Sequence, residues 1–229
     1  MSTTEYEQLV EKLKTHSSMK QYIHRNTMMQ IAAIKKEMMT LAHGLTKDVT
    51  SVDKNVEIIF TDKGDFEAEL KFSGDSLVFA MHTNTFTFAD DHAIHQLPYV
   101  QEDPRRGYCG LIQIYNFLSD SIKYNRLHDY GYLIGRIFVN SENKFFIEGR
   151  ENMSYNLIDF NEQELRPDSI QKIIADAMLY CIDFELQTPP FEQSSIITLE
   201  EKHFNHTASG MNTGKRIGFE FSSKEQKPE

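Results

Sequence analysis

The chain has 229 residues, of which 40% are hydrophobic and 25% are charged, and its formal net charge is −10 at pH 7. This composition is typical of a folded globular protein and excludes disorder over most of the length. Residues 1–48 carry seven Lys/Arg and five Asp/Glu, and residues 195–229 carry five of each, which leaves 12 basic and 24 acidic side chains in residues 49–194. Because binding a nucleic-acid backbone requires a concentrated basic face, we expect no nucleic-acid partner.

The sequence also predicts a cytoplasmic protein without a membrane partner. No apolar run approaches the roughly 20 residues needed to cross a bilayer, and the N-terminal STTEYEQLVEKLK has no apolar signal-peptide segment. Cys109 and Cys181 lie in unlike contexts, a Gly-flanked turn and a helical apolar stripe. Two such cysteines do not form a disulfide framework, so we expect free thiols.

The first 43 residues contain neither Gly nor Pro, and their apolar residues, such as Tyr6, Leu9 and Leu13, recur at helical spacing. The pattern predicts two helices with a break at Thr15–Ser18, and Gly44 stands where the second helix would end. That second helix, about residues 19–43, holds half of the ten methionines. We expect it to lie across a sheet; the alternative is that it also pairs with a second subunit through its adaptable Met side chains.

From Val56 the apolar period changes to two, which predicts strands. VEIIFT, the alternating Phe66–Phe72 segment and SLVFAMHTNTFTF form a three-strand antiparallel meander, and GYLIGRIFVN with KFFIEGR forms a further hairpin. GLIQIYNFL is either a strand or a short helix. RPDSIQKIIADAMLYCIDFEL is a helix that begins at Asp168 or Ser169.

These elements predict an α+β fold, in which N-terminal helices and a C-terminal helix pack on one face of a largely antiparallel β-sheet. We divide the chain into an N-terminal helical segment (1–46), an α+β core domain (47–199) and a polar C-terminal tail (200–229).

Two HxxH pairs are candidate metal ligands. Asp91, His92 and His95 lie within DDHAIH, and His203 and His206 lie within EKHFNH. Imidazoles three residues apart can share one ion, and a carboxylate can complete the site. Neither pair belongs to an established metal motif. We therefore expect no cofactor, and the alternative is a divalent metal at Asp91, His92 and His95.

The turn EDPRRGYCG contains the candidate nucleophile, Cys109, because the guanidinium groups of Arg105 and Arg106 would favour a thiolate. No general base is designated, and a small thiol in a tight turn is the simpler interpretation. The two arginines could clamp an anionic ligand, or they could neutralise Glu102 and Asp103.

The segments FADDHAIHQLPYV, EDPRRGYCG, IYNFLSDSIKYNR, GYLIGRIFVN and FFIEG resemble a family of uncharacterised cytoplasmic proteins from Bacteroidetes-type bacteria. The likeness continues into MLYCIDFELQTPPF and covers about half of the chain. The resemblance implies a bacterial cytoplasmic protein and supplies no catalytic residue.

The leading hypothesis for the function is a non-enzymatic binding or interaction protein, a homodimer through its long N-terminal helix, with a protein partner or ligand at the loops around 90–108 and 124–129. Tyrosines are frequent in these loops and at interfaces. The alternatives are a small metal-assisted or thiol-dependent hydrolase, or an accessory subunit or chaperone. The candidate ligand-binding residues are Arg105, Arg106, Tyr108, Asn125 and Arg126.

Overall fold

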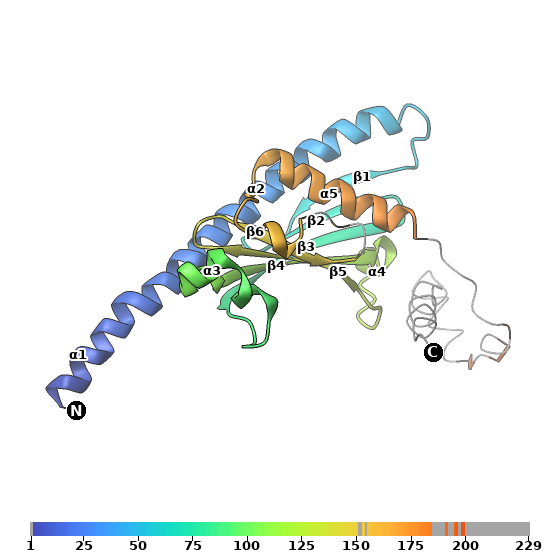
Figure 1. Ribbon diagram of the computed structural model, residues 1–229. Helices are drawn as coiled ribbons and strands as arrows, with labels where there is room; N and C mark the ends of the chain where they lie inside the picture. Colours follow the sequence, from blue (N-terminus) through green and yellow to red (C-terminus); the bar gives the residue numbers. More distant parts are fainter. Residues whose placement is uncertain are drawn as a thin grey trace, which may run out of the picture.

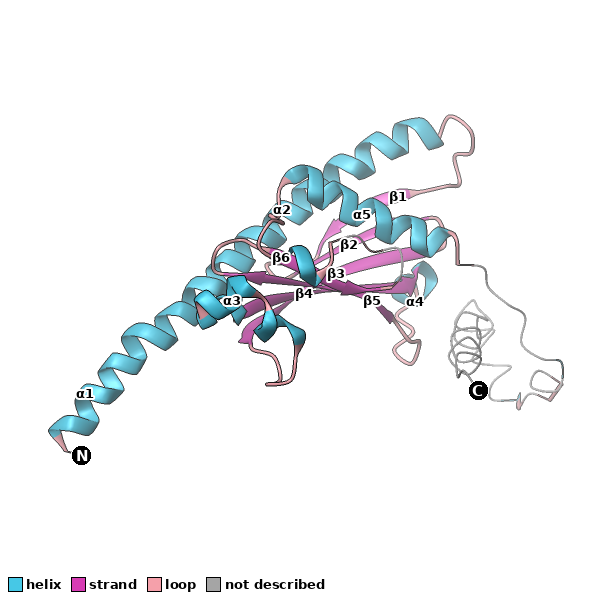
Figure 2. Cartoon of the chain, viewed as in Figure 1, coloured by secondary structure: helices cyan, strands magenta, loops and turns pink. Residues whose placement is uncertain are grey.

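A computed structural model describes residues 2–150, 153, 155–184, 191, 195, 196, 198 and 199. One long helical segment at the N-terminus is followed by six strands and then by a second long helix (Figures 1 and 2). The α+β fold class predicted from the sequence is therefore confirmed. The second histidine pair and the tail from residue 200 lie outside the described residues.

The N-terminal segment is a single continuous helix, so the predicted break at Thr15–Ser18 is wrong. Helix α1 (Thr3–Lys12) continues through a π-helical turn, η1 (Leu13–Ser17), into α2 (Ser18–Val49). Two hydroxyls in the predicted break bond back along this one helix: Thr15 donates to the Glu11 carbonyl and Ser18 donates to the Leu13 carbonyl. Such back-bonding is the competing use of Ser and Thr side chains in helices.

The predicted end at Gly44 is also wrong, because α2 continues to Val49. Leu45 packs on the hydrophobic core. The Thr46 hydroxyl lies 2.7 Å from the Ala42 carbonyl and 3.1 Å from the Ile58 carbonyl. Tertiary contacts on these residues outweigh the low helix propensity of one glycine, which is about 1 kcal/mol.

The strands form one antiparallel sheet in the order β1-β2-β3-β4-β5-β6, so every strand pairs with its neighbours in sequence. The predicted meander and the predicted hairpin are confirmed, and the ambiguous GLIQIYNFL segment is a strand. The strands are β1 (Ile58–Asp62), β2 (Glu67–Phe72), β3 (Asp75–Phe86), β4 (Cys109–Leu118), β5 (Tyr132–Asn140) and β6 (Phe145–Gly149).

One face of the sheet packs against α2 and the C-terminal helix α5 (Pro167–Ile182), which also contact each other. Helix α5 begins one residue before the predicted Asp168, because Pro167 is compatible with a first helical position. The large core lies between these two helices and the sheet. Buried residues of α2 in this core recur every three or four positions, and they are Ile31, Ile34, Met38 and Ala42.

The opposite face of the sheet is covered at one end, which the sequence analysis did not anticipate. A smaller apolar cluster there includes Cys109 and Leu111 of β4 and Phe146 of β6. It is covered by the connection between β3 and β4 and by the turn before α5. The short helices of these connections and of the β4–β5 connection are η2 (Ala93–Gln96), α3 (Pro98–Glu102), η3 (Pro104–Gly107), α4 (Ser119–Lys123) and η4 (Leu157–Asp159).

Within the described part of the chain, none of the helices combines the length and the hydrophobicity that crossing a bilayer requires.

Candidate functional site

The predicted metal ligands lie at the start of η2, where the rings of both histidines interact with neighbouring backbone groups and His92 also approaches Glu148. The Ile94 amide donates to Nδ1 of His92 at 3.2 Å, and Nε2 of His92 lies 3.6 Å from a Glu148 carboxylate oxygen. Nε2 of His95 lies 3.4 Å from the Phe88 carbonyl. Among the described residues, no three His, Cys, Asp or Glu side chains are grouped so that they could hold one metal ion. A metal at Asp91, His92 and His95 stays a prediction.

The two arginines of the η3 turn are neutralised by neighbouring acids. Arg105 makes a bidentate contact with Asp103, with hydrogen bonds of 2.7–3.1 Å, and this contact lowers the pKa of Asp103 to about 2. Arg106 pairs with Glu102 and with Glu142. Of the two interpretations left open by the sequence, charge neutralisation is the one that the geometry supports.

Arg106 belongs to a hydrogen-bonded cluster that joins the α3–η3 connection to the β5–β6 hairpin. Its guanidinium group stacks 4.5 Å from the centre of the Tyr99 ring. The Tyr99 hydroxyl donates to Glu142 at 2.8 Å and accepts from the Asn140 amide at 2.9 Å. Burial raises the pKa of Tyr99, so this hydroxyl stays protonated at neutral pH. The cluster is a network of ion pairs and hydrogen bonds that fixes the α3–η3 connection to the β5–β6 hairpin.

The five predicted ligand-binding residues do not meet in space. Arg105, Arg106 and Tyr108 precede β4, whereas Asn125 and Arg126 follow it. Strand β4 has 10 residues, and at about 3.3 Å per residue its ends are roughly 30 Å apart. The residues predicted to form one ligand-binding site therefore belong to two separate loops.

The second of these loops closes on itself. Asn125 adopts a left-handed backbone conformation (φ 50°), and the buried Arg126 donates its backbone amide to the Ser121 carbonyl. The Arg126 guanidinium group lies 3.7 Å from Asp129, which also accepts a hydrogen bond from the Ser121 hydroxyl.

Cys109 begins β4 and is fully buried, and burial raises the pKa of its thiol. A thiol held in the protonated form is a poor nucleophile. Cys109 and Cys181 form no disulfide bond, as predicted from the sequence.

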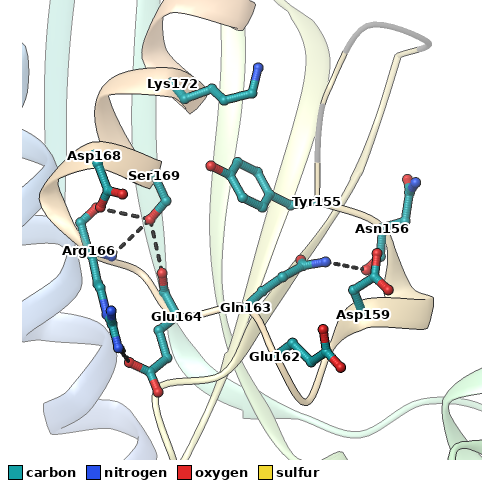
Figure 3. Close-up of a pocket in the computed structure, with 10 residues that line it drawn as sticks. All are labelled: Tyr155, Asn156, Asp159, Glu162, Gln163, Glu164, Arg166, Asp168, Ser169 and Lys172. Atoms are coloured by element: carbon teal, nitrogen blue, oxygen red, sulfur yellow. Dashed lines mark hydrogen bonds and ion pairs between the residues drawn. The ribbon is translucent and has the colours of Figure 1, made fainter.

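A polar hollow of about 530 Å³, which the sequence analysis missed, lies between the turn before α5 and the first turns of α5 (Figure 3). Its two cations are engaged, because Arg166 pairs with Glu164 and Lys172 pairs with Asp176. Within the described residues, its remaining carboxylates make no ion pair. They are Asp159, Glu162 and Asp168. The hollow is therefore acidic and unsuited to an anionic ligand.

An apolar groove of about 420 Å³ lies at the other end of α5, between the C-terminal ends of both long helices and the sheet. Leu45, Val49, Ile58, Phe72 and Met178 are among the residues that line it. Its acidic side chain is Asp75, the first residue of β3.

An exposed apolar helical surface lies at the N-terminus. We define the arm as residues 3–17, that is α1 and η1, and the arm stripe as Tyr6, Leu9, Val10 and Leu13. No residue of the arm is buried. Tyr6, Leu9 and Leu13 are 56%, 48% and 53% exposed. Figure 1 shows the arm projecting beyond the sheet, away from the other helices.

The arm is capped at its N-terminus and contacts the body at its base. The Ser2 hydroxyl accepts from the Glu5 amide and the Glu5 carboxylate accepts from the Ser2 amide, which forms a capping box. At the base of the arm, the His16 ring packs edge-on against the Tyr108 ring at 5.4 Å between centroids. Tyr108 is thus placed by the structure beside the arm. A helical apolar period was visible in the sequence, but its exposure was not.

These features define the class of the molecule: an α+β protein with one meandering antiparallel sheet, two long helices on one face and a projecting helical arm. Comparison with protein-family models, with curated proteins and with solved structures gives no match. The resemblance to uncharacterised bacterial cytoplasmic proteins stays a prediction.

Proposed function

We propose that this chain is a non-enzymatic binding protein that contacts a protein partner through its N-terminal arm. The observation that supports the proposal is the exposure of the arm stripe. The apolar period of the helix begins in the arm and continues into α2, where Ile23, Ile31 and Ile34 are at most 1% exposed. The same pattern that builds the core in α2 is thus left uncovered in the arm.

Physical chemistry favours a covered arm. Isolated helices of about 12–15 residues are marginal in water, and most helical stability in proteins comes from packing an apolar face. None of the described arm residues is buried, and at the base of the arm His16 contacts Tyr108 of the body. Contiguous exposed apolar side chains on a helix are typical of helix-mediated protein contacts.

The other predicted contact regions support this proposal less. The arginines of the loops around 90–108 and 124–129 pair with acidic residues, and the two loops lie at opposite ends of β4. We also propose a cytoplasmic location, because the two cysteines are buried and form no disulfide bond, which fits a reducing compartment.

The test is site-specific photo-crosslinking of the full chain in a bacterial host. A benzophenone amino acid replaces Leu9 on the stripe or, as the matched control, Gln8 on the opposite side of the same turn. We expect one discrete covalent adduct from position 9 and none from position 8. If position 9 gives no adduct, or if the two positions give the same products, the arm is not a contact surface and the proposal fails.

A further inference from the structure

We infer that the occupant of the arm stripe is the arm of a second copy of this chain, packed antiparallel to the first. This inference rests on the proposed function, since it names the partner of the same surface. It is carried by the order of charges along the arm. Beside the stripe, the acidic residues Glu5 and Glu7 come first and the basic residues Lys12 and Lys14 follow, whereas Glu11 lies on the side of the helix opposite the stripe.

Helical geometry places these charges on the two flanks of the stripe. At about 100° per residue, Glu5 and Lys12 lie along one flank, and Glu7 and Lys14 lie along the other. Charges that flank an apolar stripe select the partner and the orientation in paired helices. Each flank therefore carries one acid near the N-terminus and one base near the end of the arm.

In an antiparallel pair, each flank faces the same flank of the other copy with its direction reversed. If the pair is centred between Leu9 and Val10, Glu5 of one copy faces Lys12 of the second copy. Glu7 faces Lys14 in the same way, with an axial offset of about 3 Å at 1.5 Å per residue. All four charges on the flanks of each arm stripe then meet opposite charges.

A parallel pair in register has the opposite consequence. Each flank then faces the other flank of the second copy at the same height, so that Glu5 lies beside Glu7 and Lys12 lies beside Lys14. Like charges placed side by side are unfavourable, so they destabilise the parallel pair. The charge order therefore favours the antiparallel arrangement.

The length of the arm fits a second copy. In the antiparallel pair, Tyr6 packs opposite Leu13, and Ser2 reaches the level of Ser17 in the other copy. The first fully buried residue of α2 is Ile23, so the second arm ends close to where the body begins. The contact is two-fold symmetric, as most homodimer interfaces are.

The first experiment uses charge reversal on the full chain. One variant, the acidic-arm protein, combines Lys12→Glu with Lys14→Glu. The other variant, the basic-arm protein, combines Glu5→Lys with Glu7→Lys. We expect the unmodified protein to have a dimer mass by size exclusion with light scattering. Each reversed protein alone should be a monomer, with the dissociation constant raised at least about 10-fold. Mixing the two should restore a dimer.

Because no arm residue is buried, the reversed proteins should keep the circular dichroism of the sheet, which verifies folding. The exposed control Gln8→Ser with Thr15→Ser, on the opposite side of the arm, should remain a dimer. A monomeric unmodified protein, or reversed proteins that still self-associate, would overturn the inference.

The second experiment reports the orientation. Thr3→Cys is made in one preparation and Ser17→Cys in another, and a short bis-maleimide is added. The native Cys109 and Cys181 should not react with it, because both are buried. The antiparallel pair predicts a cross-link in the mixture and none with Thr3→Cys alone, since the two Thr3 positions are about 20 Å apart along the axis. Self-cross-linking of Thr3→Cys would overturn the antiparallel arrangement.

The failure of this inference can be told apart from the failure of the proposed function. If the photo-adduct from position 9 has the mass of this chain and another protein, while the purified chain is a monomer, the arm still binds a partner, but the partner is not a second copy. If no adduct forms, both proposals fail.

Discussion

Asn140 shows how one buried side chain ties three parts of the molecule together. Its side-chain oxygen accepts the backbone amides of Glu142 and Lys144, and its amide nitrogen donates to the Tyr99 hydroxyl. Its backbone carbonyl accepts the Asn26 amide of α2 at 3.0 Å. Because Asn140 is 0% exposed, its own polar atoms depend on these partners and not on water.

Replacing Asn140 by Ala should therefore destabilise the fold. Buried donors left without a partner cost about 1–3 kcal/mol, so we expect the free energy of unfolding to fall by at least that amount. The control is Asn55→Ala, whose exposed side chain bonds to Asp53 in a turn; it should stay within about 0.5 kcal/mol. Urea unfolding followed by circular dichroism measures both. Equal losses would mean that the Asn140 bonds contribute nothing specific.

Glu164, beside the polar hollow, gives a pH dependence. Hydrogen bonds from Lys144, which has the larger effect, and from Arg166 lower the pKa of Glu164 from its ordinary 4.5 to about 2. A carboxyl whose pKa is lower in the folded state stabilises the fold above its unfolded pKa. That contribution is lost as the pH falls from about 4.5 towards 2.

We expect Lys144→Met to raise the Glu164 pKa back towards 4.5, as measured by NMR titration of the side-chain carboxyl carbon. Lys172→Met is the matched control, because Lys172 lines the same hollow but pairs with Asp176. An unchanged Glu164 pKa in Lys144→Met, or an equal rise in Lys172→Met, would refute the assignment of the cause.

At the scale of elements, the strands were predictable and the helix ends were not. Alternation in Phe66–Phe72 and the turn signals around it depend only on local sequence, and every strand pairs with its sequence neighbour. The helix that runs through Ser18 and Gly44 depends on tertiary contacts, such as the Thr46 hydroxyl on the Ile58 carbonyl. Contacts of that kind are not encoded in local propensity.

The contact between α2 and β4 is close enough to exclude a methyl group. A Cβ on Gly110 would lie 1.9 Å from the Thr27 hydroxyl oxygen and 2.9 Å from the Thr27 Cβ. We expect Gly110→Ala to lower the free energy of unfolding by about 1–3 kcal/mol, the usual range for overpacking. In Gly74→Ala, the control, the new Cβ would meet nothing within 4 Å.

Combining Gly110→Ala with Thr27→Gly should recover part of the loss by removing the obstructing side chain, although Thr27→Gly alone weakens the helix. Thermal unfolding of the four proteins measures the coupling. Additive losses would show that the two residues are not in steric contact.

At the scale of the whole molecule, the candidate site could not be assembled from the sequence. Arg105 and Arg126 are close in sequence, but an extended strand separates them. His92 and His95 form a suggestive pair, but each ring nitrogen described above faces its own turn or Glu148. The sequence shows the helical apolar pattern of the arm and of α2. It does not show that the apolar residues of α2 are buried while those of the arm are exposed, because burial depends on the position of the sheet.

The separation of arm and body leads to an expectation for thermal stability. Since no arm residue is buried, deletion of residues 2–17 should leave the body folded, with Ser18 in place to cap α2. If two arms pair, the full chain is further stabilised by mass action, by about 2.7 kcal/mol at 100 times the dissociation constant. For a protein of this size, that raises Tm by about 5–10 °C.

The full chain should therefore show a Tm that rises with concentration, whereas the Tm of the deleted chain should stay constant. At high dilution the two values should converge. A concentration-independent Tm in both proteins would show that the arms do not pair, and a lower Tm of the deleted chain at every dilution would show that the arm stabilises its own body.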